Sequence, residues 1–136
     1  MLFFPDVEAM TRQYLLPKLI PDHPGLKITT QIPANLDWTT DPRLVVLTVS
    51  GAGTAMGVVY QQVLLGFDCY APTTVEASEL ARDVQAHIAH WQYETGRIAA
   101  YSSNAFPSAV PDDDTGYPHY WHSANVAVKA TDQKEA

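Results

Sequence analysis

Four of the five histidines form two pairs with the same spacing, His87-x-x-His90 and His119-x-x-His122. A structural zinc ion needs three or four such ligands that converge on it. Residues three apart share one face of a helix, but on an extended strand they point to opposite faces. The second pair falls in a predicted strand, so it cannot chelate an ion unless that strand bends. We therefore predict that the four paired histidines hold no metal.

Three other features could carry chemistry, and each has a simpler interpretation. Cys69, the single cysteine, falls on the apolar face of a predicted strand, where a buried thiol is usually inert. The glycine-rich run from Gly51 to Gly57 lacks the lysine of a phosphate-binding loop and precedes a strand, so no helix dipole meets a phosphate. The run Asp112-Asp113-Asp114 lacks the spacing of a calcium-binding EF-hand loop. The sequence thus predicts neither an enzyme nor a cofactor.

Length and charge set further bounds. The chain has 136 residues, which predicts one domain over residues 1–136 with a frayed polar tail at 131–136. No apolar run reaches the ~20 residues of a membrane helix, and the start at Met1 lacks the basic region of a signal peptide. The net charge of −7 argues against tight binding to phosphates. One cysteine excludes an internal disulfide, which fits assembly in a cytoplasm.

The stretch from Val58 to Trp91 organises the predicted fold. Apolar residues alternate from Val59 to Ala71, which predicts a strand with one covered face, and Pro72 ends it. Thr73 and Glu76 then fit a capping box at a helix start. The helix carries one apolar stripe, made of Ala77, Leu80, Ala81, Val84, Ile88 and Trp91. We expect the apolar face of this strand and the apolar stripe of this helix to pack on each other.

The remaining elements are predicted from turn signals and short apolar runs. A first helix spans residues 5–16 and is ended by Pro17 and Pro21. Further strands are predicted at 26–32, 44–50, 98–103 and 120–130, with a long proline-rich excursion at 104–118. These elements predict an α+β fold, in which two helices pack on a mostly antiparallel sheet of four to five strands.

Three segments in order carry a resemblance to a known family. They are the run Phe4-Pro5-Asp6-Val7-Glu8-Ala9, the run from Phe67 to Thr73 that passes into Glu76 to Ala81, and the Pro- and Asp-rich excursion before the closing strand. Together they resemble the tail terminator proteins of long-tailed bacteriophages, particularly those that infect actinobacteria. The likeness runs from about Phe4 to Ala130. One departure is the neutral stretch from Val58 to Gln62, where family members often carry charged residues.

The resemblance implies a structural subunit of the virion at the head-proximal end of the tail. Such subunits form a ring, usually of six copies, that stops polymerisation of the tail tube protein and forms the docking surface for the head–tail connector. DNA would pass through the ring without specific binding. Contacts between subunits or rings are then expected at the apolar amino-terminal segment, in the glycine-rich loop and in the acidic loop, at Leu2, Phe3, Phe4, Gly51, Gly53, Thr54, Met56, Gly57, Asp112, Asp113 and Asp114.

Two alternatives remain open at this stage. A head-completion protein on the connector side of the neck would differ in the partner it binds, the portal ring rather than the tail tube. A small metal-binding enzyme that uses the paired histidines is a more distant alternative, and bound metal would identify it. The acidic loop has three possible places, which are the lumen of the ring, the contact with the next ring, or the outer rim.

Overall fold

The computed structural model describes residues 3–34, 36–37, 43–51, 60–110 and 116–130. Its elements, in chain order, are α1 (Val7–Leu19), β1 (Lys27–Thr29), β2 (Leu44–Gly51), β3 (Tyr60–Tyr70), α2 (Thr74–Glu94), β4 (Ile98–Ala109) and β5 (His119–Lys129). The strands form one sheet in the order β1-β2-β3-β5-β4. Among the described strands, only β1 and β2 pair in parallel, and the other pairs are antiparallel. The predicted α+β fold, with a mostly antiparallel sheet and two helices, is confirmed.

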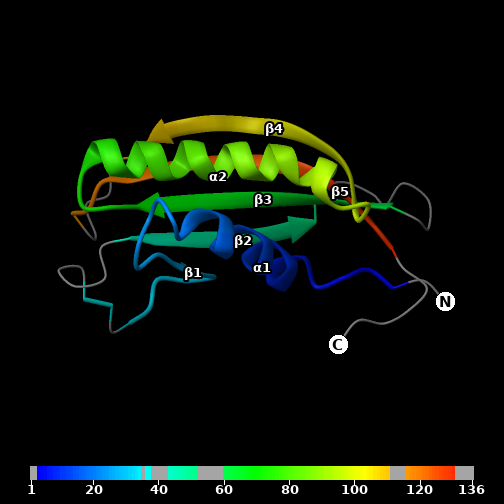
Figure 1. Ribbon diagram of the computed structural model, residues 1–136, viewed down its shortest axis with the longest axis horizontal. Coiled ribbons are helices and arrows are strands. Elements are labelled where there is room, and N and C mark those ends of the chain that lie inside the picture. Colours follow the sequence, from blue (N-terminus) through cyan, green and yellow to red (C-terminus); the bar gives the residue numbers. More distant parts are fainter. Residues whose placement is uncertain (1–2, 35, 38–42, 52–59, 111–115, 131–136) are drawn as a thin grey trace.

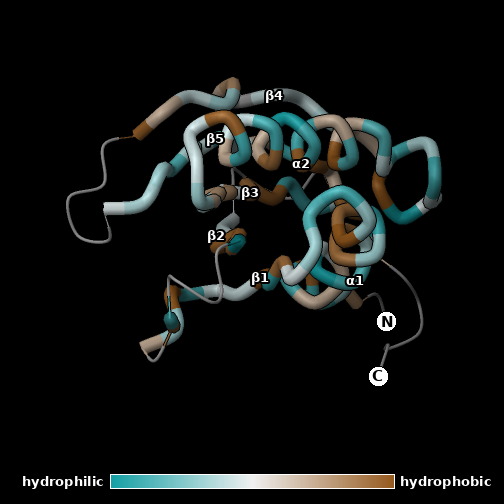
Figure 2. The backbone as a smooth tube through the Cα atoms, turned by 60° about the vertical axis from the view of Figure 1, so that its left-hand side comes forward, coloured by the Kyte–Doolittle hydropathy of each residue, from teal (hydrophilic) through white to brown (hydrophobic). Residues whose placement is uncertain are grey.

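Both helices lie on the same face of the sheet (Figure 1). The alternation in β3 has the predicted effect, because Val63, Leu65, Phe67 and Cys69 are all buried beneath the helices. The six residues of the predicted apolar stripe are the buried residues of α2. Apolar and polar stretches alternate along the tube in Figure 2, as expected for elements that bury one side only. Strand and helix thus form one continuous core.

The first helix extends further than predicted. It begins after Asp6, whose carboxylate accepts a hydrogen bond from the amide of Ala9 (3.1 Å), and it continues through Pro17 to Leu19. A proline inside a helix removes one backbone hydrogen bond, which is why we predicted an end there. Burial of Leu15 and Leu19 holds the last turn in place, and Ile20 N still donates to the carbonyl of Leu16 (3.1 Å). The prediction that Pro17 ends the helix is wrong.

The fourth strand is also longer than predicted. We assigned residues 104–109 to the proline-rich excursion, but β4 continues to Ala109 and pairs with β5 up to Tyr120. Pro107 is tolerated because β4 is an edge strand and its register with β5 shifts between Ala105 and Ser108. In contrast, the predicted strand at 26–32 shrinks to the three residues of β1. Neither described helix is long and apolar enough to cross a membrane.

Candidate functional site

The two histidine pairs do not meet. On α2, the side chain of His90 is exposed and its Nε2 lies 3.5 Å from the carboxylate of Glu94. The backbone carbonyl of His87 accepts a hydrogen bond from the hydroxyl of Tyr14 (2.9 Å). Within the described ranges, no three histidine, cysteine, aspartate or glutamate side chains are grouped so that they could hold a metal ion. The helical pair therefore has no third ligand there.

The strand pair divides between the two faces of the sheet, as the spacing predicted. His119 Nε2 lies 2.7 Å from Asp68 Oδ1, and its ring stacks on Tyr70 with 4.3 Å between ring centroids. His122 points into the core instead, where its ring stacks on Phe67 at 4.9 Å. Burial lowers the pKa of His122 to about 4, which keeps its ring neutral at pH 7. These two histidines cannot bind the same ion.

Purified protein is therefore expected to contain no stoichiometric zinc. Zinc binding requires three or four converging ligands, and the described residues contain no such group around the paired histidines. Elemental analysis of protein purified without added metal tests this, together with thermal unfolding before and after chelation. One zinc per chain, with a fall in melting temperature on chelation, would contradict the prediction and favour the metal-binding alternative.

Cys69 lies on the covered face of β3, as predicted. Its side chain is fully buried, and burial together with the charge of Asp68 raises the pKa of the thiol well above its ordinary value. Because the thiolate is the reactive form, this cysteine is a packing residue.

The predicted contact residues are only partly within the described chain. Phe3 forms an isolated β-bridge and is half-buried, and Phe4 is 39% exposed. Gly51 ends β2 and is exposed. The others lie outside the described residues, namely Leu2, Gly53, Thr54, Met56, Gly57, Asp112, Asp113 and Asp114.

Deleting residues 2–4 is expected to weaken assembly or stability. Burial of one Leu or Phe side chain contributes about 1.5–3 kcal/mol, and Phe3 is already half-buried within the chain. Size-exclusion chromatography of the deletion, alongside its urea unfolding curve, measures both effects. A deletion that assembles and unfolds like the intact chain would show that this segment makes no important contact.

Several large apolar side chains are exposed in the structure, and we did not predict their exposure from the sequence. Val75 is 66% exposed, Phe106 is 75% exposed and Tyr93 is 77% exposed. The exposure of Val75 and Tyr93 was predictable, because both residues fall outside the apolar stripe of α2. The exposure of Phe106 was not predictable, because we assigned this part of β4 to a loop.

These side chains lie at two opposite ends of the molecule. The start of α2, which carries Val75, lies at the same end as the last part of β4, which carries Phe106 (Figure 1). The end of α2, with Tyr93, lies toward the other end, where the chain enters α1 after Phe4. We call these the Val75–Phe106 end and the Phe4–Tyr93 end.

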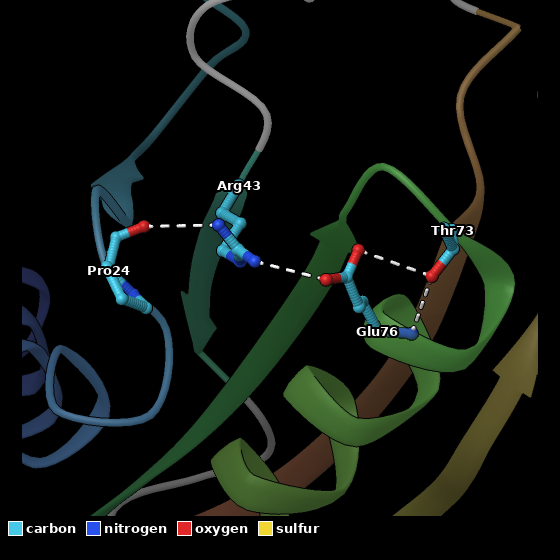
Figure 3. A network of polar contacts seen from close by, with 4 residues as sticks. All are labelled: Pro24, Arg43, Thr73 and Glu76. Atoms are coloured by element: carbon cyan, nitrogen blue, oxygen red, sulfur yellow. Dashed lines mark hydrogen bonds and ion pairs between the residues drawn. The ribbon is translucent and has the colours of Figure 1, made fainter.

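A polar network fixes the start of α2 and therefore the position of Val75 (Figure 3). The hydroxyl of Thr73 accepts a hydrogen bond from the amide of Glu76 (3.2 Å), which is one half of the predicted capping box. The Glu76 carboxylate accepts a hydrogen bond from the Thr73 hydroxyl (3.2 Å) in place of the predicted bond to a backbone amide. The Glu76 carboxylate also pairs with Arg43 (3.1 Å), whose guanidinium donates to the carbonyl of Pro24 (3.3 Å). The network joins the turn before β1, the start of β2 and the first turn of α2. The network thus anchors the first turn of α2, which carries Val75.

Comparisons with protein-family models and with curated proteins find no match for this chain.

Proposed function

We propose that this chain is a structural subunit of a bacteriophage virion that caps the head-proximal end of the tail tube. In this proposal, it forms a ring, stops polymerisation of the tube and forms the docking surface for the head connector. The observation that carries the proposal is the exposure of large apolar side chains at both the Val75–Phe106 end and the Phe4–Tyr93 end. A capping subunit needs two such surfaces, because it contacts the tube on one side and the connector on the other. The resemblance of the three sequence segments supports the same assignment.

The proposed ring contains six copies. A ring closes when each subunit uses two different surfaces to contact its neighbours, and a cap must match the symmetry of the tube it stops. Six large apolar side chains are exposed among the residues that the structure describes, and clusters of such side chains are typical of a surface that another molecule covers. The proposal requires no active site, and it assigns Asp68 and His119 to stabilisation of the sheet.

The decisive experiment mixes the purified chain with polymerising tail tube protein and images the products by electron microscopy. We expect shorter tubes with added ring density at one end. Changing both Val75 and Phe106 to serine should remove the binding of one partner while the free energy of unfolding stays close to that of the parent chain. Ser102→Ala, an exposed position on the same strand, is the matched control. Binding to portal rings alone would favour the head-completion alternative, and binding to neither would overturn the proposal.

The proposal also includes passage of DNA without binding. Six copies with a net charge of −7 would carry about −42, a field that repels phosphates. Arginines on the inner wall would instead retain DNA through salt-sensitive contacts. Among the arginines, Arg43 is already paired with Glu76. We therefore expect no change in the fluorescence anisotropy of labelled duplex DNA at about 0.1 M salt. Tight, salt-sensitive binding would contradict this part of the proposal.

A further inference from the structure

The outer face of α1 carries charged and apolar side chains in an order that would match a second, antiparallel copy of the same face. Buried Val7, Thr11, Leu15 and Leu19 form the row of α1 that faces the core. The next row, one residue further along, carries Glu8, Arg12 and Leu16, of which Arg12 is exposed and Glu8 and Leu16 are half-buried. A groove of about 340 Å³ runs beside this row and is lined by Ala9, Arg12, Gln13, Leu16, Pro17 and Ile28.

The two charged side chains on this face are not paired within the subunit. Glu8 and Arg12 are one turn apart on α1, a spacing at which opposite charges often pair. Among the residues that the structure describes, however, neither makes an ion pair or a side-chain hydrogen bond. Each is therefore available to an opposite charge on another molecule.

A second copy of the same helix supplies that charge when it runs antiparallel to the first. If Glu8 lies opposite Arg12 of the second copy, symmetry places Arg12 opposite Glu8 of that copy. The same register brings Leu16, and the groove beside it, to the start of the other helix. Phe4, with 39% of its surface exposed, precedes that start. Charges would meet in the middle of the contact, and apolar groups would meet at both ends.

We propose that the outer face of α1 binds α1 of a second copy of this chain in an antiparallel, two-fold arrangement. Glu8 and Arg12 pair reciprocally, and Phe4 of each copy enters the groove beside Leu16 of the other. This contact does not rest on the proposed ring, because a ring closes through two different surfaces whereas a two-fold contact uses the same surface twice. It joins two free subunits, or two rings face to face. A contact made by one helix of 13 residues is small, so we expect micromolar affinity.

Charge reversal with sedimentation velocity over a dilution series tests the contact. Arg12→Glu and Glu8→Arg should each weaken dimerisation at least tenfold, because like charges then face each other twice. The double variant, which carries both reversals, should dimerise like the parent chain. Arg82→Glu is the matched control, since Arg82 is exposed on α2 and this substitution changes the net charge by the same amount as Arg12→Glu. Its dimer should be unaffected.

Cysteine cross-linking tests the register. Chains that carry Glu8→Cys should form disulfide-linked dimers with chains that carry Arg12→Cys, and much less with themselves. The buried Cys69 does not interfere. The proposal is overturned if the parent chain is monomeric at millimolar concentration, if neither charge reversal weakens the dimer, or if the double variant fails to restore it. Loss of tail binding in Arg12→Glu without any change in self-association would assign this face to another partner and would also overturn it.

Discussion

Replacing His122 by phenylalanine is expected to stabilise the protein by about 1–3 kcal/mol at neutral pH. His122 is only 1% exposed, and neither of its ring nitrogens has a hydrogen-bond partner among the described residues. A buried polar group without a partner costs its desolvation energy. Phenylalanine keeps the flat ring that stacks on Phe67 and removes both polar atoms. The larger ring of the replacement needs small adjustments of its neighbours, which will reduce the gain.

The same histidine makes stability depend on pH. Burial lowers the pKa of His122 to about 4 in the folded chain, against 6.5 in the unfolded chain. Between these two values the unfolded chain binds a proton that the folded chain does not, so the free energy of unfolding falls as the pH is lowered from 6.5 toward 4. The loss reaches roughly 3 kcal/mol at pH 4 and below, and it vanishes above pH 6.5.

Urea unfolding curves at a series of pH values measure both effects. His122→Phe should remove this loss of stability on acidification, whereas the control His90→Phe, at an exposed position of α2, should retain it. If both variants lose stability on acidification as the parent does, then His122 is not the group responsible. If His122→Phe is less stable than the parent at pH 7, either the site cannot accept the larger ring or the imidazole is hydrogen-bonded.

The largest loss of stability is expected from Phe67→Ala. Phe67 is fully buried in the centre of β3, where it contacts His122. Removing such a ring leaves a cavity and costs about 3–5 kcal/mol, a large part of the 5–15 kcal/mol that holds a typical domain folded. Phe106→Ala is the matched control, because it makes the same chemical change at a side chain that is 75% exposed. It should change the free energy of unfolding by less than about 0.5 kcal/mol.

The two alanine variants should also distinguish an effect on stability from an effect on assembly. Urea unfolding is expected to detect Phe67→Ala alone, and binding to tail tubes or connector rings is expected to detect Phe106→Ala at concentrations where both variants are folded. A strong loss of stability in Phe106→Ala would mean that its ring is covered within the folded chain, and the Val75–Phe106 end would then lose its role in the proposal.

The central strand and helix were predictable from sequence because each signal is local. The alternation in β3 and the stripe in α2 both reflect burial of one face, and the cap at Thr73 needs only a residue three positions away. The ends of α1 and β4 were not predictable. Proline usually ends a helix or a strand. Tertiary packing keeps α1 helical beyond Pro17, and the edge position of β4 allows Pro107 within the strand.

The candidate surfaces were harder to predict than the core. Exposure of Phe106 depends on β4 being an edge strand, which follows from sheet order and not from the sequence near residue 106. The opposite placement of His119 and His122 was predictable, since it follows from strand geometry alone. The ion pair of Arg43 with Glu76 joins residues 33 apart, and no local pattern indicates it.

The sheet order also determines when a growing polypeptide can complete this sheet. β5 is the last described strand in chain order, yet it lies between β3 and β4. Until residues 119–129 have been synthesised, β3 and β4 each present an unpaired edge, and the core lacks Ala124, Val126 and Val128. The surface of β4 that carries Phe106 is therefore formed late. A chain translated only as far as β4 does not yet have this surface in its folded form.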